Sequence, residues 1–380
     1  MRASSIDIHP NAKWSQNGIT VAGGNGWGSG TNQLNQPFGL YVDDDRTIYV
    51  ADWYNHRIVE WKSDATNGRV VAGGNGEENG AHQLNCPVDV IIDKESDCLI
   101  INDWQNKRVV RWPRRNGTRG ETIISNISCI GLTMGNNGFL YVVDDEEHEV
   151  RRYKIDDTKG TVVAGGNGKG HRLDQLSNPH YVFVDRDHSV YVSDYWNHRV
   201  MKWEEGATQS IVVAGGQGKG NSLTQLNYPQ GLVVDQLGTV YVADSRNHRI
   251  MRWPKGATQG SVIIGGNSEG AQSNQLNSPI GLSFDRHGST KPLINKYKKK
   301  QYGQMIKYAL INDDHGVICT VDLPIYRTKV KGNIGFCFHA EVRPKLDGKD
   351  CWEKLTFIYL QDQIPMLLGD VEECIKLLRQ

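Results

Sequence analysis

The feature that most constrains this chain is a tandem repeat. The motif Pro37-Phe38-Gly39-Leu40 returns as Pro87-Val88-Asp89-Val90, Pro179-His180-Tyr181-Val182, Pro229-Gln230-Gly231-Leu232 and Pro279-Ile280-Gly281-Leu282. Most copies stand 50 residues apart, and the 92-residue gap between Pro87 and Pro179 holds a shorter copy, Cys129-Ile130-Gly131-Leu132, with Cys in the proline position. A period of this size indicates stacked supersecondary units.

Each copy carries the same succession of short strands and turns. The first copy runs through residues 39–43, 48–52, 58–61 and 70–72, which are rich in β-branched and aromatic residues. A glycine-rich connector such as Gly73-Gly74-Asn75-Gly76 then leads to the next proline, and such connectors supply many of the 42 glycines among 380 residues. One four-stranded antiparallel sheet per copy is typical of a β-propeller blade, and no helical periodicity competes before residue 290.

A short polar element follows the second strand of three copies. It reads Asp-x-x-Asn-His-Arg, and its fixed residues are Asp52, Asn55, His56, Arg57, Asp194, Asn197, His198, Arg199, Asp244, Asn247, His248 and Arg249. These copies resemble the Asn-His-Leu (NHL) repeat family over about residues 19–286. The resemblance implies an all-β, six-bladed NHL-type β-propeller over residues 19–290, with five clear repeats and an incomplete sixth. It further implies that an N-terminal strand at residues 19–24, after an extension at residues 1–18, closes the sixth blade.

The repeated polar residues have two readings. His56, His198 and His248 would make a ring of metal ligands if they converged. We interpret the element as structural instead, because Asp and Asn side chains satisfy the backbone of turns, and the following His and Arg can pack against the neighbouring blade. The glycine-rich connectors lead into Gln-Leu-Asn-x-Pro instead of a helix, so no phosphate-binding loop is expected.

The positions that differ between copies are better candidates for a site. Directly after the proline position, where the inner strands begin at the mouth of the channel, stand Phe38, Val88, Ile130, His180, Gln230 and Ile280. We predict that they contact a partner. The peptidyl-hydroxyglycine amidating lyases, which belong to the same family, place a zinc-binding His here in several blades. This chain offers His180 alone, too few ligands for catalytic zinc. No catalytic residue, metal or other cofactor is therefore expected.

The third copy departs from the pattern. Its connector is eight residues shorter, and Asp144-Asp145-Glu146-Glu147-His148-Glu149 replaces the usual polar element. Five carboxylates in six residues would attract a cation or a basic partner, or would form a solvated turn. We favour the solvated turn, because the spacing of an EF-hand calcium loop is absent.

Residues 291–380 lack the repeat and resemble no family that we recognise. They hold 15 Lys and Arg against 11 Asp and Glu, while the rest of the chain holds 28 against 32, so the zero net charge averages two unlike parts. Strands are predicted at residues 304–311, 316–322, 334–342 and 355–360, and a helix at residues 370–379. We expect a small α+β appendage, with residues 305–310 supplying a missing blade strand. A fusion of a truncated propeller to unrelated sequence is the alternative origin.

Nothing in the sequence predicts a membrane protein. No apolar stretch is long enough to span a bilayer, and the first residues lack the apolar core of a signal peptide. The seven cysteines show no CxxC spacing, and their number is odd. This argues against a zinc module or a full disulfide framework, so we expect a cytoplasmic protein.

The leading hypothesis for function is a non-enzymatic binding scaffold. A face or the channel mouth of a monomeric propeller would hold a protein or peptide. The first alternative is RNA binding, known for some NHL propellers, although the basic run at residues 296–300 is short. The second is substrate recognition within a ubiquitin ligase complex, without a RING module in this chain. The third, a propeller lyase or hydrolase, lacks a catalytic constellation.

Overall fold

The computed structural model describes residues 14–15 and 17–284, together with the backbone of seven strands between residues 292 and 360. The chain divides into two compact units, Met1–Asn312 and Asp313–Gln380. Each unit consists of strands in its described part, apart from four short 3₁₀ turns in the first. No helix among the described residues is long and apolar enough to cross a bilayer.

The first unit is a β-propeller with five regular blades, each a four-stranded antiparallel sheet whose strands follow chain order. The first two blades are β2 (Pro37–Val42), β3 (Ile48–Asp52), β4 (Arg57–Trp61), β5 (Arg69–Gly73), then β6 (Pro87–Asp93), β7 (Cys98–Asp103), β8 (Arg108–Pro113), β9 (Glu121–Ser125). The third is β10 (Cys129–Met134), β11 (Leu140–Asp144), β12 (Glu149–Tyr153), β13 (Thr161–Gly165). The last two are β14 (Pro179–Val184), β15 (Val190–Asp194), β16 (Arg199–Trp203), β17 (Ile211–Gly215), then β18 (Pro229–Val234), β19 (Val240–Asp244), β20 (Arg249–Trp253), β21 (Ser261–Gly265).

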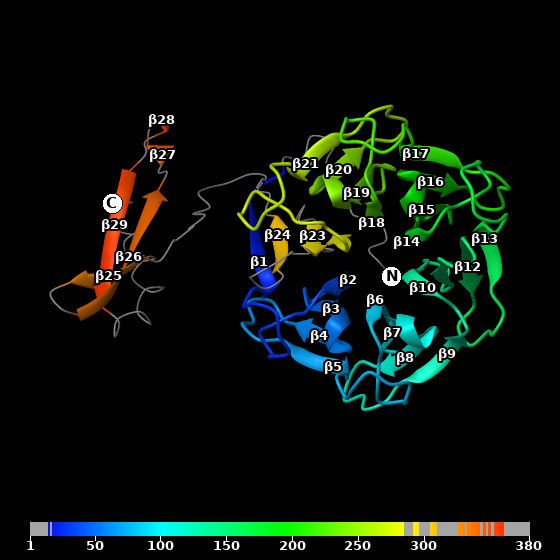
Figure 1. Cartoon of the computed structure of the whole chain (residues 1–380), viewed down its shortest axis with the longest axis horizontal. Coiled ribbons are helices and arrows are strands. Elements are labelled where there is room, and N and C mark those ends of the chain that lie inside the picture. The colour runs from blue at the N-terminus through cyan, green and yellow to red at the C-terminus, as the bar shows by residue number, and fades with distance from the viewer. Residues whose placement is uncertain are drawn as a thin grey trace. The chain divides into compact units, whose positions relative to one another are not determined.

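The blades stand radially around a central axis, with the first strand of each blade innermost and the fourth at the rim (Figure 1). Because the blades pack face to face against their neighbours, their middle strands are largely buried; all five residues of β3 are buried. The tryptophan at or next to the end of the third strand is at most 2% exposed in four blades (Trp61, Trp112, Trp203, Trp253), and Tyr153 takes its place in the third. The connector leucines Leu34, Leu84, Leu176, Leu226 and Leu276 are also at most 1% exposed.

Between the second and third strands of four blades, a 3₁₀ turn carries the polar element. These turns are η1 (Trp53–Asn55), η2 (Trp104–Asn106), η3 (Tyr195–Asn197) and η4 (Ser245–Asn247). The residue that ends each turn adopts the left-handed backbone conformation, with φ between 47° and 56° at His56, Lys107, His198 and His248. This conformation reverses the chain so that the third strand can pair with the second.

A further four-stranded sheet combines the two ends of the first unit. Its strands, in spatial order, are β1 (Gly18–Gly23), β24 (Met305–Ala309), β23 (Pro292–Asn295) and β22 (Leu282–Phe284). β1 pairs antiparallel with β24, from Gly18 opposite Ala309 to Gly23 opposite Met305. The sequence predicted both a contribution from the N-terminal strand and one from residues 305–310, and the pairing contains both.

The second unit holds a three-stranded antiparallel sheet of β25 (Tyr326–Val330), β26 (Asn333–Val342) and β29 (Glu353–Leu360), and a two-stranded ribbon of β27 (Lys345–Leu346) and β28 (Lys349–Asp350). Strands predicted at residues 334–342 and 355–360 coincide with β26 and β29, whereas β25 was not predicted. The strand predicted at residues 316–322 and the helix at residues 370–379 lie outside the described residues, so the α+β class of this part remains a prediction.

Candidate functional site

The fixed Asp of each polar element is buried and fully hydrogen-bonded. In the first blade, Asp52 Oδ1 accepts the Asn35 N–H at 2.6 Å, and Oδ2 accepts Asn55 Nδ2 at 2.8 Å and Arg57 Nε at 2.7 Å. The same Asp–Arg pair forms in blades two, four and five, at 2.6 to 2.7 Å. Burial raises the pKa of each of these carboxyls, and the hydrogen bonds from Asn and Arg oppose that rise.

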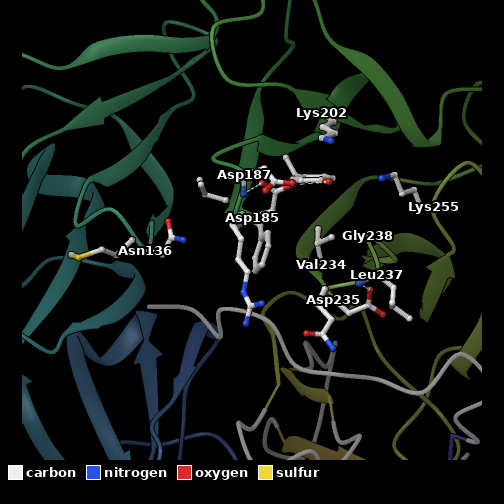
Figure 2. Close-up of a pocket in the computed structure, with 15 residues that line it drawn as sticks. Asn136, Asp185, Asp187, Lys202, Val234, Asp235, Leu237, Gly238 and Lys255 are labelled. Carbon is white, nitrogen blue, oxygen red and sulfur yellow. Dashed lines mark hydrogen bonds between the residues drawn. The ribbon is translucent and has the colours of Figure 1, made fainter.

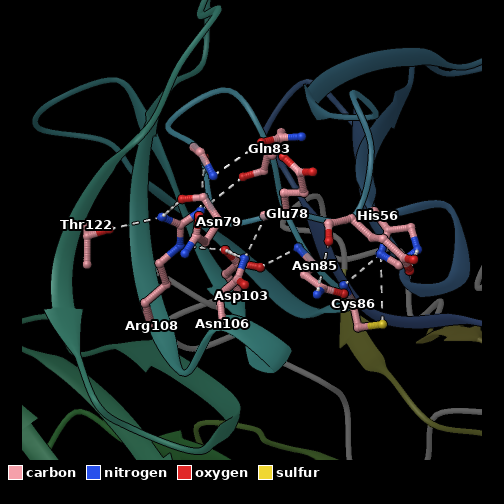
Figure 3. A network of polar contacts seen from close by, with 12 residues as sticks. His56, Glu78, Asn79, Gln83, Asn85, Cys86, Asp103, Asn106, Arg108 and Thr122 are labelled. Carbon is pink, nitrogen blue, oxygen red and sulfur yellow. Dashed lines mark hydrogen bonds and ion pairs between the residues drawn. The ribbon is translucent and has the colours of Figure 1, made fainter.

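The Arg and Asn of the element reach back to the connector that precedes their blade. Arg57 donates to the carbonyl oxygens of Ser29 at 2.7 Å and of Gly30 and Gln33 at 3.1 Å. Figure 3 shows the counterpart in the second blade, where Arg108 lies between Asp103 and the connector residues Asn79 and Gln83. The connector and the link between strands two and three therefore lie on one face of the propeller, which we call the link face.

The histidine of the element joins its blade to the next one. His56 Nδ1 accepts the backbone N–H of Cys86 at 3.1 Å, and equivalent bonds join His148 to Asn178, His198 to Tyr228 and His248 to Ser278. Each of these four Nδ1 atoms is thus an acceptor within the fold, and each histidine serves a different blade junction. The geometry does not bring them together as ligands of one metal ion.

The six residues after the proline position, from which partner contacts were predicted, differ in their exposure and in their contacts. His180 Nδ1 lies 2.9 Å from Gln230 Oε1, and the His180 ring stacks on Tyr195 at 3.8 Å. Burial lowers the pKa of His180 to about 4. Phe38 lies against Trp53, with ring centroids 5.5 Å apart. Ile130 is half-buried, whereas Val88 and Ile280 are 3% and 6% exposed, so these two have little surface to offer.

Sequence reasoning missed a second variable set, the two unspecified positions inside each polar element. They are Trp53 and Tyr54, Trp104 and Gln105, Asp145 and Glu146, Tyr195 and Trp196, and Ser245 and Arg246 in blades one to five. At the second of these positions the side chain points to solvent: Tyr54 is 55% exposed and Trp196 48%. The rule applied to the proline position, that a site breaks the symmetry of a repeat, would have found them.

Cations and aromatic rings meet on the link face at blades four and five. Lys169 Nζ lies 4.0 Å from the centre of the Trp196 ring, and Lys219 Nζ lies 4.9 Å from that of Tyr228. The ring centroids of Tyr228 and Tyr195 lie 4.8 Å apart. Together with Trp196, Lys219, Asn227 and Arg246, these two rings line a cleft of about 460 Å³. The link face thus combines flat aromatic surfaces with positive charge in one place.

Comparison with known proteins identifies the repeat. The NHL repeat family matches residues 34–61, in the first blade and its connector, and residues 226–252, in the fifth. The chain is an NHL-repeat β-propeller protein. Among solved structures, similar chains include a protein of unknown function from Bacteroides thetaiotaomicron, at 15% identity over 78% of this chain and 76% of that chain, with a TM-score of 0.60.

Two further similar structures carry functional descriptions. The PQQ-bound aldose sugar dehydrogenase of Streptomyces coelicolor matches at 14% identity over 80% of this chain and all of that one, with a TM-score of 0.56. An auxiliary nutrient binding protein of Bacteroides ovatus matches at 13% identity over 82% and 76%, with a TM-score of 0.55. At these identities the likeness shows the propeller fold alone, a fold that serves enzymes and binding proteins alike.

The opposite face of the NHL propeller, which carries the turns between strands one and two and between three and four, also holds a cleft. Its volume is about 230 Å³, and Figure 2 shows its acidic and basic side chains coming from blades four and five. Asp185 accepts the N–H groups of Asp187 and Ser189 and the Tyr191 hydroxyl, and Asp235 binds its own turn in the same way. Both carboxylates therefore accept hydrogen bonds from their own turns.

The third blade of the NHL propeller replaces the buried Asp–Arg pair with two carboxylates. Asp144 pairs across the strands with Glu149, and both residues are buried. Burial, together with the neighbouring carboxylates, raises the pKa of Asp144 to about 6. Glu149 binds Arg151, and Glu146 binds Lys107 at 2.8 Å, so basic neighbours partly neutralise the acidic run. The solvated turn predicted here is found for Glu146 and Glu147 only, which are exposed.

Proposed function

We propose that this NHL-repeat protein is a non-enzymatic binding scaffold that holds a protein or peptide partner on the link face. One observation carries the proposal: the positions that vary within an otherwise fixed polar element place large aromatic side chains in solvent on a single face. Exposed Trp and Tyr are costly to a folded chain and are the residues most enriched at the energetic centres of protein interfaces.

The backbone of the link supports this proposal because it holds the variable side chains at fixed positions. The N–H groups of Tyr54, Gln105, Trp196 and Arg246 donate to connector carbonyls at 3.1 to 3.2 Å. The side chain at each of these positions is exposed. Such residues lose little conformational freedom of the backbone when a partner binds, which favours affinity.

We further propose that the sheet of β22, β23, β24 and β1 is the sixth blade and closes the ring. Its neighbours support this assignment. The Gly231 N–H of β18 donates to the Ile280 carbonyl at 2.8 Å, and a methyl group on Gly281 would come within 2.9 Å of the Phe38 carbonyl oxygen. The strand region that begins this sheet thus approaches both the fifth and the first blade. A closed ring would leave no free sheet edge.

The binding proposal is tested by affinity capture with the full chain and two variants. Trp196→Ala removes an exposed aromatic side chain from the link face. Leu237→Ala removes an exposed aliphatic side chain, 46% exposed, from the opposite face. We expect quantitative mass spectrometry after crosslinking to show partners retained by Leu237→Ala and depleted about tenfold by Trp196→Ala. Equal recovery with both variants would contradict the use of the link face.

RNA binding is the alternative that a specific observation favours, since lysines over aromatic rings also suit stacked bases. Nuclease treatment of the same captures separates the two. Partners that remain after nuclease treatment support the protein-binding proposal, and material lost with the RNA would replace it.

A further inference from the structure

We infer that the link-face partner is an acidic peptide segment and that it binds at blades four and five; this deepens the proposed function and rests on it. The surface concerned is formed by Lys169, Trp196, Lys219, Tyr228 and Arg246, and we call it the cationic aromatic patch. Its residues come from three places in the repeat: two connectors, two links and the position before the proline of the fifth blade.

Contacts among these residues make the patch one surface. Lys169 comes from the connector before blade four and covers Trp196 in the link of that blade. Lys219 comes from the next connector and covers Tyr228, and Arg246 lines the same cleft as Trp196, Lys219 and Tyr228. Three positive charges from two neighbouring blades thus lie around one group of aromatic rings.

The charges of the patch are available to a ligand. Lys169, Lys219 and Arg246 are exposed, and within residues 17–284 no carboxylate lies at ion-pair distance from any of them. By contrast, Arg57, Arg199 and Arg249 are buried against their Asp partners. The cations of the patch therefore contribute nothing to the internal ion pairs of the fold, and the aromatic rings beneath the two lysines hold the ammonium groups in place.

The surroundings of the patch favour a peptide over a nucleic acid. Glu269 lines the adjoining cleft beside Arg246, and the link of blade three, on the other side, presents exposed Glu147. The region outside residues 291–380 is acidic overall, with 28 Lys and Arg against 32 Asp and Glu. A long polyphosphate chain would meet repulsion on both sides, whereas a few acidic side chains beside an aromatic or apolar residue match a small cationic area.

The inference is tested by fluorescence anisotropy with the full chain and labelled peptides of defined composition. The probe is a peptide of alternating Glu and Tyr, and its analogue has Gln at every Glu position. We expect the acidic peptide to bind at least about tenfold more tightly at about 50 mM salt, and the difference to shrink at about 500 mM salt, where exposed charges are screened.

Charge reversal locates the site. We expect Lys169→Glu and Lys219→Glu each to weaken binding of the acidic peptide by about tenfold, and to improve binding of a Lys-and-Tyr peptide. The matched control is Lys255→Glu, an exposed lysine that lines the cleft on the opposite face, and it should leave the affinity unchanged. A gain of affinity for the basic peptide also shows that the variant is folded.

Three results would overturn the inference: equal binding of the Gln analogue, unchanged binding by both lysine variants, or tighter binding of oligouridylate that the same variants abolish. A complete absence of peptide binding would overturn it as well. Failure of the broader proposal looks different. If partners captured by the native chain are lost with Trp196→Ala but kept with Lys219→Glu, the link face binds its partner without the charge assigned here.

Discussion

At the scale of single residues, the polar element separates side chains that build the fold from side chains that face solvent. Asp194, Asn197, His198 and Arg199 all bond to the backbone or to one another, and Trp196 between them is exposed. The structural interpretation of the fixed residues followed from their repetition. Their actual partners did not, because Arg199 binds carbonyls 24 to 28 residues earlier in the chain, a distance that no local pattern encodes.

Removal of one buried arginine should be far more damaging than removal of an exposed one. Arg199→Ala would leave Asp194 buried without its cation and three connector carbonyls without their donor, so we expect a loss of about 3–5 kcal/mol in the free energy of unfolding. Arg172→Ala breaks an exposed pair with Asp174, which solvent screens, and should leave the free energy of unfolding nearly unchanged. Urea titration measures both, and similar losses for the two variants would contradict this assignment.

His180 should make the propeller less stable in mild acid. Burial lowers its pKa to about 4, below the usual value of 6.5, so the folded state keeps the ring neutral while the unfolded chain takes up a proton. The stability that the neutral ring contributes is complete above about pH 6.5 and is lost as the pH falls toward 4. At pH 5 the loss is about 1–2 kcal/mol.

The His180 effect must be isolated, because Asp144, with its pKa raised to about 6, acts in the opposite direction over the same range. We therefore compare the native chain with His180→Gln by urea titration at about pH 7.5 and pH 5. The native chain should lose about 1–2 kcal/mol more than the variant between the two values. Equal losses would show that His180 does not titrate as proposed.

At the scale of elements, the sequence predicted the blades well and the connectors less well. Short runs of β-branched and aromatic residues, repeated at intervals of 50 residues in most copies, predicted the strands of the five blades. The two variable positions of the link were missed because aromatic residues inside a β repeat look like packing residues. Trp61 and Trp196 show the difference. Trp61 ends a strand between two blades and is 1% exposed, whereas Trp196 lies in a 3₁₀ turn and is 48% exposed.

The connector leucines should prove essential even though they lie in loops. Leu226 is fully buried and Leu223, in the same connector, is 43% exposed. We expect Leu226→Ala to cost about 2–5 kcal/mol of stability and Leu223→Ala less than about 0.5 kcal/mol. Thermal or urea unfolding checks the pair. A small effect of Leu226→Ala would mean that the connector is held by the arginine of the link alone.

At the scale of the whole molecule, residues far apart in the sequence complete one sheet. β1 comes from the start of the described chain and β24 from residues beyond the last recognisable repeat. The repeat predicted where the first strand of this sheet begins but could not identify its second and third strands, because residues 285–310 have lost the motif. Only the apolar pattern at residues 305–310 indicated a strand there.

Two truncations test the closure of the ring. A chain that ends at Asn312 loses only the second compact unit, and we expect it to unfold cooperatively near the temperature of the full chain. A chain that ends at Asn295 also loses β24, leaves β1 without its partner and exposes strand edges. It should unfold at a lower temperature and aggregate. Calorimetry and light scattering compare them, and indistinguishable behaviour would refute closure by β24.

The link combines fixed residues that build the fold with variable residues that face solvent, and this has a consequence for how such a protein diversifies. Because the backbone N–H groups of Tyr54, Gln105, Trp196 and Arg246 anchor the link and their side chains are exposed, these side chains can be exchanged without disturbing a buried hydrogen bond. A gene that duplicates its blades thus copies a stable frame together with positions that are free to mutate. New partners can be acquired by a few codon changes, while the rest of each repeat stays under selection for folding.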